Sequence, residues 1–162
     1  MACDNYKPHV HVLPEDDANK DIANGFRLGI DFAKSRQLQI LPVAGGWGNV
    51  LNEFEEDRVR EMRSNNRRHM VLLIDFDGRL ERSDEAKESI PNDLQGRVYI
   101  LGTLTNPEEA KKKIGCSYEK IGLELAKDCS KGTENVWGHK CLQHNREELD
   151  RLRKDLRSIF FQ

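Results

Sequence analysis

The sequence predicts an α/β domain with a mainly parallel, four-stranded sheet flanked by helices, a Rossmann-like arrangement, followed by a helical C-terminal third. Three observations lead to this class. Short apolar runs that fit strands alternate with segments of helical periodicity. The run from Met70 to Ile74 is apolar throughout, which is typical of a strand covered on both faces. After about residue 105 the pattern is helical only.

The expected strands are short runs bounded by turn or polar residues, at residues 10–13, 38–43, 70–74 and 98–101. Around the first strand His9 and His11 alternate with valines and therefore share one face. We interpret both histidines as packing residues. The crossovers between the parallel strands should be right-handed.

Helical periodicity fills the first two connections. Residues 19–35 and 49–62 repeat apolar side chains at spacings of three and four, with charged residues on the other side. Each pattern predicts a helix that packs its apolar stripe on the sheet.

The C-terminal third is expected to hold three helices. One begins at Pro107, with acidic residues in its first turn, and a second covers residues 118–129. In the last, Asn145 and Glu148 have the spacing of a capping box. Its apolar stripe consists of Leu149, Leu152, Leu156 and Ile159.

Length and composition favour one domain. The 162 residues contain no linker rich in proline, glycine or serine, and no internal repeat. We therefore expect a single domain over 1–162, with a core at about 6–105 and a helical extension at about 106–162. The formal net charge of -2 gives no general positive field, so binding of nucleic acid would require a local basic patch.

The sequence also predicts a cellular location. No stretch approaches the roughly 20 apolar residues that span a bilayer, and the first residues lack the features of a signal peptide. We expect a cytoplasmic protein without membrane association, in which the four cysteines are reduced.

Acidic residues follow two of the predicted strands. Glu15 comes after the first strand, and Asp75 and Asp77 come after the third. Carboxyl ends of parallel strands are where ligands collect, and in an extended segment Asp75 and Asp77 point to the same side. Three carboxylates are hard oxygen ligands suited to Mg²⁺ or Mn²⁺, which would relieve their mutual repulsion.

An ordinary structural role is the alternative for these acids. Asp16 or Asp17 can cap the helix that follows, or add a ligand, and Asp77-Gly78 can be a simple turn.

The order of these motifs resembles the Toprim domain, which occurs in topoisomerases, DnaG-type primases, OLD-family nucleases and small RNase M5-like nucleases. The matching segments are Val12-Leu13-Pro14-Glu15, Leu41-Pro42-Val43-Ala44-Gly45-Gly46 and Leu73-Ile74-Asp75-Phe76-Asp77, within roughly the first 105 residues. The resemblance implies a Mg²⁺-dependent nuclease. It implies that Glu15 is a general acid/base, and in some members a metal ligand, and that Asp75 and Asp77 are paired metal ligands. The family often has Glu-Gly where this chain has Glu15-Asp16.

Further residues are candidates for contacts with the substrate. Arg79 follows the acidic pair and is placed to reach a phosphate, and the turn at Gly45-Gly46 offers backbone N–H groups. Lys140 is a third candidate, in a segment expected to fold over the acidic edge. The basic stretch at residues 58–69 precedes the third strand, so it is expected at the opposite end, where its interleaved acids favour a solvated helix face. A zinc site from Cys129, His139, Cys141 and His144 would lack the usual Cys-x-x-Cys knuckle.

Two other functions fit parts of the pattern. Asp75-Phe76-Asp77-Gly78 is similar to the opening of a haloacid-dehalogenase-type phosphatase, with Asp75 as nucleophile, Asp77 as acid and Thr103 as a second motif, although Arg79 replaces that family's Thr or Val. A non-catalytic module would instead bind a nucleotide, a nucleic acid or a partner protein. The last helix ends in Ile159-Phe160-Phe161, which can dock on the domain or pair with a second chain.

Overall fold

The computed structural model describes residues 3–161 and contains one sheet of four parallel strands in the order β2-β1-β3-β4. The strands are β1 (His9–Pro14), β2 (Leu38–Ile40), β3 (Arg68–Asp75) and β4 (Val98–Thr103). From β1 the chain first moves outward to β2 and then crosses back to β3. The direction of winding therefore reverses between β1 and β3, which makes this pair the topological switch point of the sheet.

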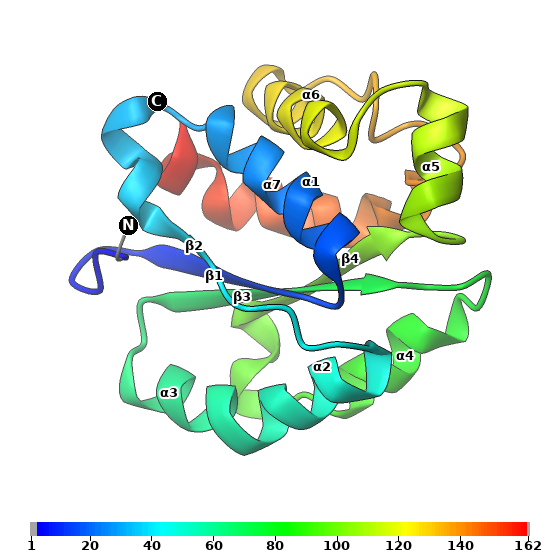
Figure 1. Ribbon diagram of the computed structural model, residues 1–162. Coiled ribbons are helices and arrows are strands. Elements are labelled where there is room, and N and C mark those ends of the chain that lie inside the picture. Colours follow the sequence, from blue (N-terminus) through cyan, green and yellow to red (C-terminus); the bar gives the residue numbers. More distant parts are fainter. Residues whose placement is uncertain (1–2, 162) are drawn as a thin grey trace.

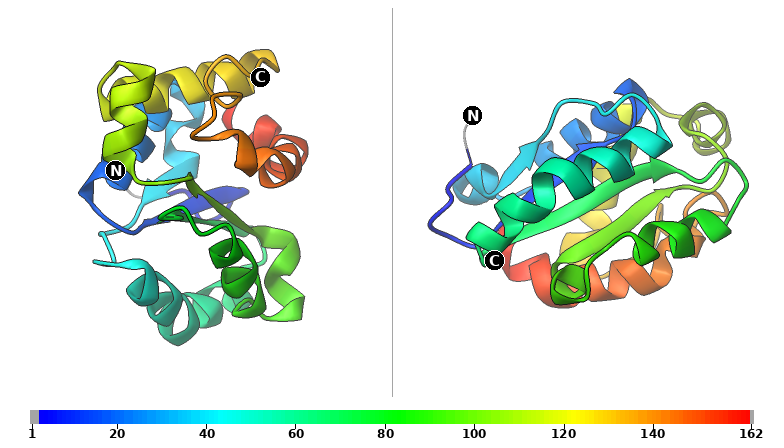
Figure 2. Two further views of the ribbon diagram at one scale, coloured as in Figure 1. Left: turned by 90° about the vertical axis from the view of Figure 1, so that its right-hand side faces the viewer. Right: turned by 90° about the horizontal axis from the view of Figure 1, so that it is seen from below.

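Helices cover both faces of the sheet and give three layers (Figures 1 and 2). One face carries α1 (Asp17–Leu28), α5 (Pro107–Ile114), α6 (Tyr118–Lys131) and α7 (Arg146–Phe160). The other carries α2 (Trp47–Glu53), α3 (Val59–Ser64) and α4 (Glu81–Glu88). Short turns of other helix types lie at Phe32–Gln37, Phe54–Arg58, Asn92–Arg97 and Gln143–Asn145. The predicted α/β class, with its four-stranded parallel sheet, is confirmed.

Alternation along the strands separates two apolar cores. Val10 and Val12 of β1 point into the core beneath α1, α6 and α7, whereas Leu13 points into the core above α2, α3 and α4. The predicted stripe of α7 is buried in the first core. Phe160 and Phe161 are buried there too, and Phe160 meets Phe26 of α1 edge to face at 6.0 Å. The aromatic end of the chain therefore docks on its own domain.

Three helices differ from the sequence prediction. The first helix ends at Leu28 rather than at Ser35, because Gly29 has low helix propensity and lies against Ala126 of α6. The second is interrupted by a π-helical turn at Phe54–Arg58. The helix α4 was not predicted, since Ala86 is its one buried residue and it has no apolar stripe. In the described part of the chain no helix has the length and apolar character needed to cross a membrane.

Glycines let α1 and α6 approach each other closely. A Cβ atom on Gly25 would lie 1.9 Å from the backbone oxygen of Glu119, and one on Gly122 would lie 1.9 Å from that of Ile22. No side chain fits at either position, so the two backbones pack directly together.

Polar side chains from the first turn of α7 and from the residue just before it bond the free edge of β4. Asn145 Oδ1 accepts the Gly102 N–H at 3.1 Å, and Asn145 Nδ2 donates to the Gly102 oxygen at 2.9 Å. One helical turn on, Glu148 accepts the Ile100 N–H at 2.8 Å. The predicted capping box is therefore wrong: Asn145 makes no side-chain cap bond, because an edge strand with unpaired backbone groups takes both side chains.

The loop before α7 is organised by a buried carboxylate. Asp128, at the end of α6, accepts the Thr133 hydroxyl at 2.7 Å and the Val136 N–H at 2.7 Å. The N–H groups of Asn135 and Trp137 bond the same carboxylate. Four donors on one carboxylate fix the turn that returns the chain to the sheet.

Candidate metal centre at the sheet edge

Glu15 and Asp75 meet at the C-terminal edge of the sheet, at the switch point. Glu15 directly follows β1 and Asp75 ends β3, its neighbour in the sheet. Glu15 Oε2 accepts the Asp75 N–H at 2.6 Å, and the Glu15 N–H donates to the Leu73 oxygen at 2.9 Å. The residues from separate strands that were expected to lie close together are neighbours at this edge, joined by the bond from the Asp75 backbone to the Glu15 carboxylate.

The environment disfavours ionisation of this pair. Burial raises the pKa of Asp75 to about 6, and the charges of Glu15 and Asp77 add to the rise, while the Asp77 N–H opposes it. Burial also raises the pKa of Glu15, against the effect of the N–H groups of Asp75 and Trp47. Since desolvation is the main cause in both, a nearby cation would favour the charged forms.

The backbone at Asp77 differs from the predicted extended conformation. Its backbone is in the left-handed region, with φ of 51°, and Gly78 follows with φ of 72°. The Asp77 N–H donates to Asp75 Oδ1 at 3.0 Å, so the chain turns instead of remaining extended. The expectation that Asp75 and Asp77 point to one side of an extended segment is wrong. The Asp77 side chain is 69% exposed at the rim of the site.

Arg82 of α4 is a cationic side chain that contacts both Asp75 and Asp77. Its Nη1 donates to the backbone oxygen of Asp75 at 2.7 Å, and its Nη2 lies 3.9 Å from Asp77 Oδ2. The guanidinium stands 5.1 Å from the centre of the Trp47 ring. Arg82 was not predicted from the sequence, because α4 has no apolar periodicity that would place it. The one signal for it was its position in the sequence, a few residues after Asp77.

Other residues expected to contact the substrate or the metal bond to neighbouring parts of the protein. The N–H groups of Gly45 and Gly46 donate to the Glu15 backbone oxygen at 2.9 and 3.2 Å, so they hold the loop against β1. Arg79 lies 3.2 Å from Glu81 and 3.4 Å from Glu85. Asp16 caps α1 by accepting the Asn19 N–H at 2.9 Å, in agreement with the alternative reading.

The segment before α7 reaches the same edge. The Leu104 N–H donates to the Cys141 oxygen at 2.9 Å, and the His144 ring meets Phe76 at 4.9 Å. Lys140 is exposed next to Cys141. Thr103 pairs with Asp75 in the register of β3 and β4, and its hydroxyl is buried with no hydrogen-bond partner.

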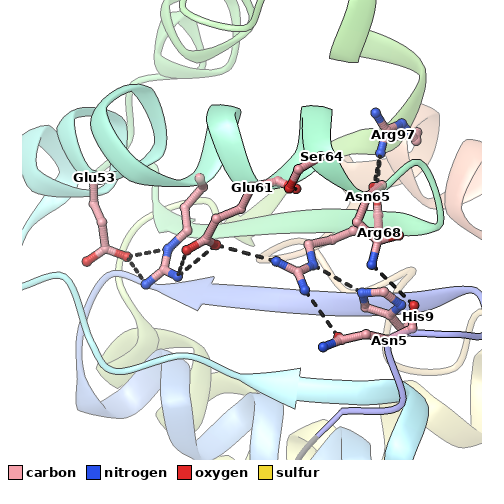
Figure 3. Close-up of polar contacts among 9 residues, drawn as sticks. Asn5, His9, Glu53, Glu61, Ser64, Asn65, Arg68 and Arg97 are labelled. Carbon is pink, nitrogen blue, oxygen red and sulfur yellow. Dashed lines mark hydrogen bonds and ion pairs between the residues drawn. The ribbon is translucent and has the colours of Figure 1, made fainter.

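The basic stretch lies at the opposite end of β3, in ion pairs (Figure 3). Arg58 lies 3.1 Å from both Glu53 and Glu61. Arg68 is buried and lies 3.4 Å from Glu61. The expectation that these arginines sit away from the acidic edge is confirmed.

A different group of residues brings possible metal ligands close together. Among residues 3–161, Cys3, His9 and His11 have ligand atoms all within 4.8 Å of one another. Glu15, Asp75 and Asp77 do not form so tight a set. The four cysteines and histidines weighed as a zinc site in the C-terminal segment do not either. Both histidines were interpreted as packing residues, and Cys3 is far from any motif, so only the folded chain joins them.

Comparison with known proteins adds no relative: no family model, no curated protein and no solved structure matches this chain. What the site does must be argued from its own geometry.

Proposed function

We propose that the protein cleaves phosphodiester bonds in nucleic acid with the help of Mg²⁺ or Mn²⁺ bound at the C-terminal edge of the sheet. The observation that carries this proposal is the meeting of Glu15 and Asp75 at the switch point, with Asp77 at the rim. Burial raises the pKa of both carboxyl groups. A bound cation would offset this effect by stabilising their charged forms.

In this proposal Asp75 and Asp77 supply oxygen ligands. A bound divalent ion would neutralise charge on the phosphate and activate water. Glu15 shares the ion or carries the proton, a role that its raised pKa supports, since an acid/base group works best with a pKa near the working pH.

Arg82 would provide the contact with the phosphate backbone. It already lies beside the acids, and only 14% of its side chain is exposed, so its position is fixed. Arg79 and Lys140 are exposed around the same edge and would add weaker, salt-dependent contacts.

Calorimetry of Mg²⁺ and Mn²⁺ binding, together with a nuclease assay on single- and double-stranded DNA and RNA, tests the proposal. Wild type should bind the ions and cleave one of these substrates. Asp75→Asn should lose both properties, and the exposed Asp57→Asn should keep both. A folded wild type that binds neither ion at millimolar concentration would overturn the proposal.

The phosphatase alternative keeps one favourable observation, the register pairing of Thr103 with Asp75. It predicts Mg²⁺-dependent hydrolysis of a simple phosphomonoester, with no cleavage of nucleic acid, and loss of this activity in Asp75→Asn. Metal binding with neither activity would instead favour the non-catalytic module.

A further inference from the structure

A buried group of nitrogen and sulfur ligands lies at the N-terminal end of β1. His9 and His11 project from the same face of the strand, and their ring centroids are 5.5 Å apart. Cys3, in the segment before the strand, completes the group, with ligand atoms of all three residues within 4.8 Å of one another. The exposed fractions are 8% for Cys3, 0% for His9 and 5% for His11.

The hydrogen bonds of His9 fix its tautomer. Its Nδ1 lies 2.7 Å from the Lys7 backbone oxygen, which can only accept, so Nδ1 carries the proton. Its Nε2 accepts from Arg68 Nε at 3.0 Å and therefore has the free electron pair. An imidazole whose other N–H is held by a backbone carbonyl is the usual state of a metal-ligating histidine.

His11 has no such partners. Both ring nitrogens are buried and make no hydrogen bond. Leaving a buried polar group unpaired is costly, and in native structures nearly all such groups have a partner. An ion bound to one nitrogen would supply one of the two missing partners.

We propose that Cys3, His9 and His11 bind a divalent transition-metal ion of the zinc type, through one thiolate and two imidazole nitrogens. Imidazole and thiolate are the ligands that Zn²⁺ prefers, whereas Mg²⁺ requires oxygen. Three protein ligands leave a fourth position for water or a backbone oxygen. This site goes beyond the proposed function and does not depend on it.

The surroundings are compatible with a bound ion. Besides His9, Arg68 contacts Asn5 Oδ1 at 3.1 Å and Glu61 at 3.4 Å, so it keeps two partners when His9 Nε2 turns to the metal (Figure 3). Burial, with the charge of Arg68, lowers the pKa of His11 to about 3, so its imidazole is neutral and able to bind. Burial raises the pKa of the Cys3 thiol to about 11, so the ion must displace its proton to solvent.

The site is separate from the acidic edge. From His9 to Glu15 the chain advances six residues along β1, roughly 20 Å at the rise of an extended strand. A metal here would tie the segment at residues 3–8 to the sheet, and its binding energy would stabilise the fold.

Titration of the reduced, metal-free full chain with Co²⁺ tests the proposal. We expect a thiolate-to-cobalt charge-transfer band that saturates at one equivalent and disappears when Zn²⁺ is added. Zn²⁺ should also raise the Tm. Absence of the band, in a protein whose circular dichroism shows it to be folded, would overturn the proposal.

Variants locate the ligands. Cys3→Ser should abolish the band, and His11→Gln should weaken Zn²⁺ binding by more than the roughly 10–100-fold that loss of an outer-shell partner costs. Cys116→Ser, in the α5–α6 connection, is the matched control and should keep the band. Asp75→Asn should keep it as well, which separates this site from the acidic edge. A band that survives in Cys3→Ser, or unchanged Zn²⁺ affinity in His11→Gln, would refute the assignment.

Discussion

The bonds between Asn145 and the free edge of β4 give a sharp test of how α7 is attached. Asn145 accepts one hydrogen bond from Gly102 and donates two, to the oxygens of Gly102 and Leu142, both at 2.9 Å. Asn145 itself is 2% exposed, so water cannot replace these partners. The substitution Asn145→Ala removes all three bonds at once.

The expected loss is large. An unpaired buried N–H costs about 1–3 kcal/mol, and the Gly102 carbonyl adds to this, whereas the Leu142 oxygen keeps its bond from the Asn145 backbone N–H. Asn145→Ala should therefore lower the free energy of unfolding by about 2–5 kcal/mol. That is a large share of the roughly 5–15 kcal/mol by which a domain is usually stable. The newly free edge strand should also promote association between chains.

Urea unfolding followed by circular dichroism measures this loss, and size-exclusion chromatography detects the association. Asn66→Ala, at an exposed asparagine, is the matched control and should change stability by no more than about 0.5 kcal/mol. A loss below about 1 kcal/mol for Asn145→Ala would refute the reasoning, because the edge of β4 would then not depend on this side chain.

Three further predictions concern single side chains. The pKa of Asp75 is raised from 3.8 to about 6, so the stability given by its neutral form is complete below pH 3.8 and is lost as the pH rises through 6. In metal-free buffer Asp75→Asn should therefore be more stable than wild type at neutral pH. The urea midpoints of the two proteins should converge in acid. Gly122→Ala should lower the Tm, because its Cβ meets the Ile22 oxygen and overpacking costs about 1–3 kcal/mol, whereas Gly96→Ala, with open space around it, should be tolerated. Burial raises the pKa of Asp128, but its hydrogen bonds lower it below 3.8 overall. Asp128→Asn should therefore lower the free energy of unfolding by about 2–4 kcal/mol at neutral pH. In urea unfolding the difference from wild type should shrink as the pH falls through the depressed pKa.

The strands and the acids that follow them could be predicted because they depend on local pattern. Apolar runs such as Met70–Ile74 are buried wherever they pack, and parallel strands bring their carboxyl ends to one edge. Glu15 and Asp75 were therefore expected to be neighbours, and they are. The helix α4, by contrast, could not be predicted from the apolar pattern, because Ala86 is its one buried residue. Arg82, which lies on this helix, was therefore not predicted as part of the site.

The sequence by itself determined the α/β class, the buried stripe of α7 and the edge at which the carboxyl groups gather, because periodicity and strand direction act over a few residues. Only the tertiary structure decided which side chains meet across the fold. Asn145 and Glu148 have the spacing of a cap but bond β4, and Cys3 reaches His9 and His11 through a loop that no pattern describes. Such contacts depend on the order of the strands and on how closely the helices pack, and these are properties of the whole chain.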